Sequence, residues 1–167
     1  MTMTTTAPET TITASDEVPT ISISREFDAP RELVFRAWTD PELVPQWLGP
    51  DDIATEIVRW ECRRGGEWAY INTRIGGEQD FEAGFYGSFH EVREPELLVQ
   101  TFTWEGWPDG VSLERMVFEE LPGGRCRVSA TSLFDSFEAR DGMLSSGMDK
   151  GVTEGYAKLD RLLQRLG

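Results

Sequence analysis

Cysteine and histidine are scarce in this sequence, and their scarcity excludes several kinds of site. The 167 residues contain only Cys62 and Cys126, too few for a disulfide framework, and we expect both thiols to be reduced and buried. The single histidine, His90, cannot join them in a spaced zinc pattern. The sequence therefore predicts no metal site, and it gives no indication of a cofactor.

Basic residues and long apolar runs are also few. Sixteen Lys and Arg residues stand against 30 Asp and Glu residues, which gives a formal net charge of -14. DNA, RNA and anionic membranes all require a basic surface, so we expect no nucleic-acid partner and no membrane partner. No apolar run approaches the roughly 20 residues that span a bilayer. We expect a cytoplasmic protein.

The first 17 residues differ in composition from the rest of the chain. They are rich in threonine and contain no aromatic residue. Such a segment buries too little apolar surface to offset the entropy lost on ordering. We predict a flexible leader over residues 1–17, with a partner-binding tail as the alternative, and a single domain over residues 18–167.

Strand and helix signals alternate in a simple order after the leader. Period-two alternation from Ile21 predicts a first strand that ends near Phe27. Asp28-Ala29-Pro30 and Asp40-Pro41 are helix-start signals and predict two short helices. Turns rich in glycine and proline then separate six strand-like segments, at residues 53–61, 68–74, 81–92, 97–104, 112–121 and 125–133. Their short connections predict antiparallel pairing.

A long helix is predicted at the C-terminus, over about residues 147–165, with a capping start at Ser146. Its apolar face consists of Met148, Val152, Leu159, Leu162 and Leu166. One helix cannot cover seven strands, so we expect a strongly curved sheet that wraps around it. The space left between sheet and helix is the default ligand site.

Several segments resemble one known family. Residues 27–42 look like the opening of START-like (SRPBCC) domains of the heat-shock-chaperone ATPase activator type. Residues 47–50 follow the family's Trp-Trp-Gly-Pro, with Leu48 at the second position. Residues 61–68 resemble its Asp-x-Arg-Pro-Gly-Gly-x-Trp turn, although Glu61 replaces Asp and Arg64 replaces Pro. Similar blocks at residues 87–101 and 147–162 extend the resemblance over most of the chain.

The resemblance implies an α+β helix-grip fold: a curved antiparallel sheet of about seven strands around a long C-terminal helix, with two short helices after the first strand. It does not decide the function, because the family includes ligand carriers, polyketide cyclases and co-chaperone domains. Our leading hypothesis is a module that binds a small apolar or aromatic molecule.

Two other functions stay open. A metal-free enzyme of the cyclase, dehydratase or hydrolase kind would need at least two convergent ionisable groups in the cavity, one with a displaced pKa. A co-chaperone would need a chaperone-binding part, for which residues 1–17 are too short. A homodimer also stays open.

Aromatic residues on the predicted strands are the main candidates for a ligand-binding wall, with plain core packing as the alternative for each one. Strand parity places four pairs on the face toward the helix: Trp68 and Tyr70, Phe85 and Phe89, Phe102 and Trp104, and Met116 and Phe118. The predicted ligand-binding set is Trp47, Trp68, Tyr70, Phe85, Phe89, Phe102, Trp104, Met116, Phe118, Met143, Met148 and Gly151.

Three glycines recur at four-residue spacing in the predicted terminal helix: Gly147, Gly151 and Gly155. Each costs about 1 kcal/mol relative to alanine inside a helix. Either close backbone approach to the sheet or room for a ligand explains the row. His90 is expected on the outer face. Glu61, Glu114 and Arg115 are candidate acids or bases of the pocket, with solvated strand positions as the preferred explanation. We name no catalytic residue.

Overall fold

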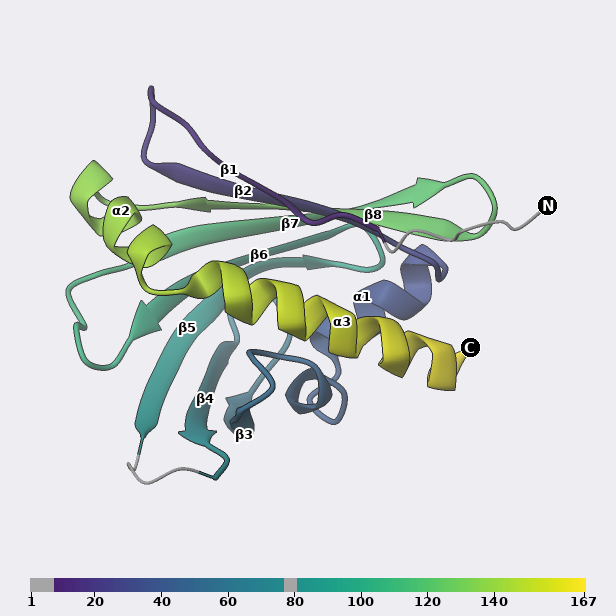
Figure 1. The fold of residues 1–167 in the computed structure, drawn as a ribbon, viewed down its shortest axis with the longest axis horizontal. Coiled ribbons are helices and arrows are strands. Elements are labelled where there is room, and N and C mark those ends of the chain that lie inside the picture. The colour runs from purple at the N-terminus through teal and green to yellow at the C-terminus, as the bar shows by residue number, and fades with distance from the viewer. Residues whose placement is uncertain (1–7, 77–80) are drawn as a thin grey trace.

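The computed structural model describes residues 8–76 and 81–167, in which one curved sheet wraps around the C-terminal helix (Figure 1). The strands are β1 (Thr11–Ala14), β2 (Thr20–Phe27), β3 (Ile53–Trp60), β4 (Glu67–Arg74), β5 (Glu82–Arg93), β6 (Leu97–Trp104), β7 (Ser112–Leu121) and β8 (Arg125–Leu133). The helices are α1 (Arg31–Thr39), the single 3-10 turn η1 (Val44–Gln46), α2 (Phe137–Ser145) and α3 (Met148–Leu166). The predicted helix-grip fold is confirmed.

All neighbouring strands pair antiparallel, in the spatial order β1-β2-β8-β7-β6-β5-β4-β3. Strands β3 to β8 form a meander, because each short turn returns the chain beside the strand it has just left. Strand β2 instead pairs along its whole length with β8, from Thr20 opposite Leu133 to Phe27 opposite Cys126.

The N-terminal segment corrects one expectation. Residues 11–14, which we predicted within the flexible leader, form the edge strand β1, so the sheet of the described chain has eight strands. Threonine and isoleucine favour extended backbone, and pairing with the free edge of β2 needs no core contact. Arg140 of α2 donates to the carbonyl oxygens of Ser15 and Thr20, at 2.8 and 3.0 Å, and so holds the connecting turn. Residues 1–7 of the predicted leader lie outside the described residues.

Helix α1 lies at one end of the curved sheet (Figure 1), and both α1 and turn η1 contact α3. Helix α1 begins after Pro30 and buries Val34, Phe35 and Ala37. Pro45 lies inside η1 and keeps it to one turn, as the sequence predicts. These two elements close one end of the space between sheet and helix.

The start of α3 differs from the predicted cap. Ser146 ends α2, and its hydroxyl donates to the carbonyl oxygen of Met143 at 2.6 Å. Gly147 then turns the chain with φ at +85°, a conformation that glycine adopts freely, and α3 follows. Helix α2 precedes this turn, and Ser136 caps it by accepting from the Ala139 N–H at 3.1 Å.

An ion pair ties the first long strand to the last helix. Arg25 of β2 is only 5% exposed and bonds both carboxylate oxygens of Asp160 of α3, at 2.7 and 2.6 Å. The two-pronged geometry fixes the position of α3 across the sheet.

A bilayer-spanning helix is not found among residues 8–76 and 81–167.

Candidate functional site: a cavity between the sheet and α3

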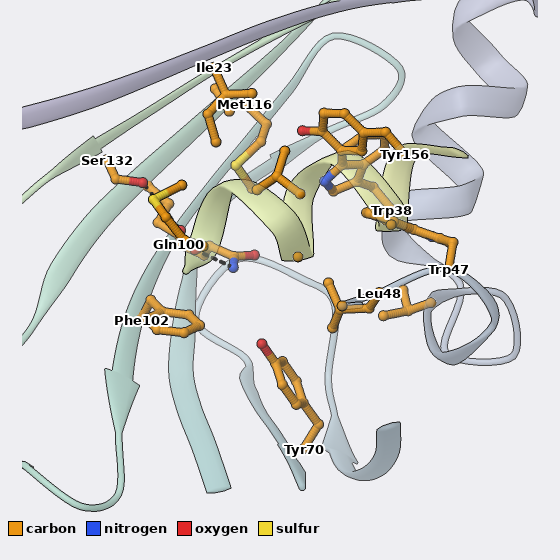
Figure 2. Close-up of a pocket in the computed structure, with 18 of the residues that line it drawn as sticks. Ile23, Trp38, Trp47, Leu48, Tyr70, Gln100, Phe102, Met116, Ser132 and Tyr156 are labelled. Carbon is orange, nitrogen blue, oxygen red and sulfur yellow. Dashed lines mark hydrogen bonds between the residues drawn. The ribbon is translucent and has the colours of Figure 1, made fainter. Parts of the chain in front are cut away.

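A cavity of about 290 Å³ lies between the concave face of the sheet and the N-terminal half of α3. Figure 2 shows its wall, to which α1 and η1 also contribute. Aromatic side chains dominate the lining: Trp38, Trp47, Trp60, Trp68, Tyr70, Phe102 and Tyr156. The cavity is therefore mostly apolar, as ligand sites in proteins commonly are.

Two of the indole rings use their polar atoms on nearby backbone. The Trp47 Nε1–H donates to the carbonyl oxygen of Ala37 at 2.9 Å, and the Trp60 Nε1–H donates to that of Thr39 at 2.7 Å. Both acceptors belong to the last turns of α1. These bonds anchor the rings and leave their apolar surfaces for the cavity.

Strand β4 contributes a stacked aromatic pair. The rings of Trp68 and Tyr70 lie 5.3 Å apart and are tilted by only 21°, with Phe102 of β6 5.8 Å from Trp68. The Trp68 indole lies over Gly87 of β5, where a Cβ atom would come within 2.7 Å of Nε1 and 2.0 Å of the Thr101 carbonyl oxygen. Glycine at this position lets the large ring lie flat on the sheet.

A polar row crosses the apolar wall. Gln100 of β6, Glu114 of β7 and Ser132 of β8 stand directly opposite one another in the strand register. Gln100 Nε2 donates to Glu114 Oε1 at 3.0 Å, and Ser132 Oγ donates to Glu114 Oε2 at 3.3 Å. Figure 2 shows Gln100 and Ser132 on the sheet side of the cavity. The row places one carboxyl group among aromatic rings.

Burial shifts the pKa of the ionisable groups in this wall. Loss of solvent raises the pKa of Glu114, and the two hydrogen bonds from Gln100 and Ser132 oppose the rise only in part. Burial, and to a smaller extent the nearby Glu114 charge, raises the pKa of Tyr70. The pKa of Tyr156 is raised mainly by burial as well. Both phenols therefore stay neutral, and Glu114 is the acid of the site.

Comparison with known families decides the family of the chain. The model described as "Activator of Hsp90 ATPase homolog 1-like protein" matches residues 28–164. The chain belongs to this family. The resemblance to START-like domains of the ATPase activator type is thus confirmed, while the family membership names no ligand.

Solved structures share the fold of this Activator of Hsp90 ATPase homolog 1-like domain. Protein Ms6760 from Mycobacterium smegmatis is 25% identical, with a TM-score of 0.82, 93% of this chain covered and 97% of that one. A protein from Arthrobacter aurescens is 27% identical, with a TM-score of 0.83, 93% of this chain covered and 91% of that one. Among curated proteins, no match to the chain was found.

Part of the predicted ligand-binding set lies at the cavity of this family member. The residues in its lining are Trp47, Trp68, Tyr70, Phe102, Met116, Met148 and Gly151. They come from η1, three different strands and α3, and the fold brings them around one space. Their contact with a ligand stays a prediction.

Two predicted residues are core rather than lining. Phe89 is buried edge-on against Trp60, with ring centroids 5.4 Å apart. Phe118 is 1% exposed and packs against Phe35 and Trp38, at 5.0 and 5.5 Å. Both face the helix side, as parity predicts, but side chains of neighbouring elements already cover them. Here the packing alternative holds.

Three further predicted residues lie away from the lining. Phe85 packs against Phe102, at 5.2 Å, outside the residues that border the cavity. Trp104 is 51% exposed, because β6 ends there and its ring lies against Gly106 in the following turn. Met143 belongs to α2, which lies beyond the start of α3. We expected Phe102 and Trp104 on the face that the helix covers. This is wrong for Trp104, because its side chain at the end of β6 is exposed.

The polar row and one tyrosine are absent from the predicted set. We expected Glu114 to be solvated, yet it borders the cavity. The signal was present, since Glu114 shares strand parity with Met116 and Phe118 and so belongs to the apolar face. Tyr156 follows Val152 by four residues and lies on the same helical stripe.

The three glycines of the α3 row have three different surroundings. A Cβ atom on Gly155 would lie 2.9 Å from the Trp47 carbonyl oxygen, so the close approach is to the segment after η1 and not to the sheet. A Cβ atom on Gly151 would meet only Pro50, at 3.5 Å, and this residue borders the cavity. Gly147 serves the turn between α2 and α3.

The two cysteines and His90, the other residues with reactive side chains considered above, lie outside the lining of the cavity. Both cysteines are free, and burial raises the pKa of each thiol to about 11, which suppresses the reactive thiolate. His90 is exposed, as parity predicts. Across the described residues, no group of three or more His, Cys, Asp or Glu side chains is placed to hold a metal ion.

Proposed function

We propose that this protein binds a small molecule, apolar or aromatic over most of its surface, in the cavity between the sheet and α3. The cavity volume supports the proposal most strongly. Protein interiors are normally packed with few voids larger than a water molecule, and an apolar cavity of about 150 Å³ already accepts benzene. The 290 Å³ found here gives room for a molecule of about two aromatic rings.

The position of small residues on α3 supports the same proposal. Gly151 borders the cavity, and a Cβ atom there would meet only Pro50, so the helix leaves space at this position instead of filling it. An unfilled cavity lowers the stability of the fold, and a bound apolar molecule restores the lost contacts. The polar row of Gln100, Glu114 and Ser132 would then orient one polar group of the ligand.

A cavity-filling substitution tests this function. We expect wild-type protein to bind the neutral fluorescent probe N-phenyl-1-naphthylamine, and Gly151→Leu to weaken that binding by about tenfold or more, since leucine occupies the probe's space. Stability should be unchanged or improved because leucine is the better helix former. Gly142→Leu is the matched control: Gly142 is also a helical glycine, with nothing within 4 Å of its Cβ position and away from the cavity lining.

Two outcomes would contradict the proposal. One is a wild-type protein that neither takes up the probe nor carries a co-purified small molecule in native mass spectrometry. The other is a Gly151→Leu variant that binds the probe as wild type does but loses stability, which would make the glycine a packing feature.

One observation favours an enzyme in the same cavity as the second candidate. Glu114 has a raised pKa and lies among neutral phenols, which is an arrangement suited to acid–base chemistry on a bound molecule. Turnover of aryl esters above the buffer rate, lost in Glu114→Gln, would support this candidate. If no turnover depends on Glu114, the enzyme candidate is rejected and the binding function is kept.

The family description also supplies a hypothesis that does not depend on the cavity. It names activation of the Hsp90 ATPase. The corresponding test measures the ATPase rate of purified Hsp90 with and without this protein. Stimulation that persists in Gly151→Leu would assign the activity to the surface of the domain instead of the cavity.

A further inference from the structure

We infer that the ligand of the cavity is an organic cation, an apolar or aromatic molecule with one protonated amine that pairs with Glu114 of β7. This inference rests on the proposed function, because it names the ligand class for the same cavity. Three independent features of the wall carry it: the direction of its hydrogen bonds, its charge and its aromatic faces.

The hydrogen bonds of the polar row all run toward Glu114. Gln100 gives its amide nitrogen and Ser132 gives its hydroxyl hydrogen to the two carboxyl oxygens. What the row has left to offer is mostly acceptor capacity: the second lone pairs of the Glu114 oxygens, the Gln100 carbonyl oxygen and the Ser132 lone pairs, against one remaining N–H of the Gln100 amide. A carboxylate or phosphate on the ligand would place acceptor against acceptor at Glu114, whereas an ammonium group presents up to three donors.

The cavity offers no opposite charge to Glu114. Of the described residues that line the space, Glu114 is the one carboxyl group, and lysine, arginine and histidine are not among them. The buried Arg25 is already held by Asp160. A buried carboxyl group is stabilised in its charged form by an opposite charge at hydrogen-bond distance, and a bound ammonium group would supply that charge.

The aromatic faces suit the same ligand. Ammonium groups bind over the faces of tryptophan, tyrosine and phenylalanine, and cavities with several such rings recognise them selectively. Figure 2 shows Tyr70 with its hydroxyl directed toward the space enclosed by the labelled residues, with Phe102 and Gln100 nearby. An ammonium group at the polar row would therefore have rings beside it and a carboxylate behind it. The net charge of -14 also attracts cations at long range.

Three probes of similar shape separate these contributions: naphthalen-1-ylmethylammonium, naphthalen-1-ylmethanol and naphthalene-1-carboxylate. We expect calorimetric titration of wild type at neutral pH to show the cation binding at least about tenfold more tightly than the alcohol, with the anion weakest. Glu114→Gln should remove the preference for the cation and retain binding of the alcohol. Glu120→Gln is the matched control, since Glu120 is an exposed acid on the same strand and its substitution changes the net charge equally.

The outcomes are distinguishable. Equal binding of cation and alcohol by wild type, tightest binding of the anion, or a cation preference that survives in Glu114→Gln would overturn the inference and leave the binding function intact. A preference lost equally in Glu120→Gln would assign it to net charge and overturn the inference as well. Failure of all three probes and of the neutral dye would overturn the proposed function itself. If Glu114→Gln does not fold, the relative affinities of wild type for the three probes test the inference that the ligand is a cation.

Discussion

The two ends of the space between the sheet and α3 contain similar aromatic residues but arrange them differently. At the α1 end the rings meet edge to face: Phe35 and Phe118 are inclined by 70°, and Phe27 and Tyr156 by 80°. On the strands β4, β5 and β6 beside the cavity the rings are inclined less, in a continuous set made of Trp68, Tyr70, Phe85 and Phe102 with interplanar angles between 21° and 39°. Edge-to-face rings interlock and fill a volume, whereas a parallel layer forms a wall.

The difference arises from what stands opposite the rings. Helix α1 directs Phe35 and Val34 into the filled end, and both are buried. The α3 residues that border the cavity are Met148, Gly151, Val152, Gly155 and Tyr156. The cavity in this fold therefore lies where one turn of the helix, from Gly151 to Gly155, carries small residues between two large ones.

The largest expected effect compares one ring from each end. Phe118→Ala should lower the free energy of unfolding by about 3–5 kcal/mol, because neighbours on all sides lose contact with the deleted ring. Phe102→Ala should cost less, about 1–2 kcal/mol, since that ring already borders empty space on one face. Chemical denaturation of both variants measures the difference. Equal losses would mean that the cavity end is packed as tightly as the filled end.

A medium effect is expected from the two glycines of α3. Gly155→Ala should destabilise the protein by about 1–3 kcal/mol, because the new methyl group would press on the Trp47 carbonyl oxygen. Gly151→Ala should instead stabilise it by about 0.5–1 kcal/mol, the usual gain of alanine over glycine in a helix. Thermal unfolding distinguishes the two. Stabilisation by both substitutions would contradict the close approach at Gly155.

The smallest effect concerns the pH dependence of the cavity end. The pKa of Glu114 is raised in the folded protein, so the folded state holds this proton more tightly than the unfolded chain does. Its contribution to stability is present below the unfolded value of about 4.5 and is lost as the pH rises through the folded value. Glu114→Gln cannot lose a proton, so its stability relative to wild type should increase between pH 4 and pH 7 in urea denaturation. A difference that is constant over this range would place the carboxyl group in solvent.

The sequence predicted the long elements of the fold because their signals are local. Alternation, turn residues and the helical stripe of α3 each act over a few neighbouring positions. Strand β1 was not predicted because it has one large apolar residue, Ile12, and is ordered by pairing with the edge of β2, which no local pattern indicates. The burial of Trp104 was predicted wrongly, because parity indicates on which face of a strand a side chain lies but not how far along the strand other elements cover that face.

The site was predictable in its aromatic part and not in its polar part. Strand parity alone puts Trp68, Tyr70 and Phe102 on the inner face, where they border the cavity. Glu114 required knowing that Gln100 and Ser132 stand beside it, and that register depends on pairing among three strands. An acid on an apolar face is the signal by which such a row can be found in other sequences.

The pairing of β2 with β8 sets the order in which the segments of the chain can fold. Glu26 on β2 and Arg127 on β8 form their hydrogen bond across 101 residues, and Arg25 reaches Asp160 across 135. On the ribosome, β2 is made before its main partner β8 and before α3, the helix that lies against it. Contacts of such long sequence separation make folding slow, because the entropy of closing the chain must be overcome first. The meander from β3 to β8 can form with its own neighbours, and the closing event is the return of the C-terminal third to the first long strand.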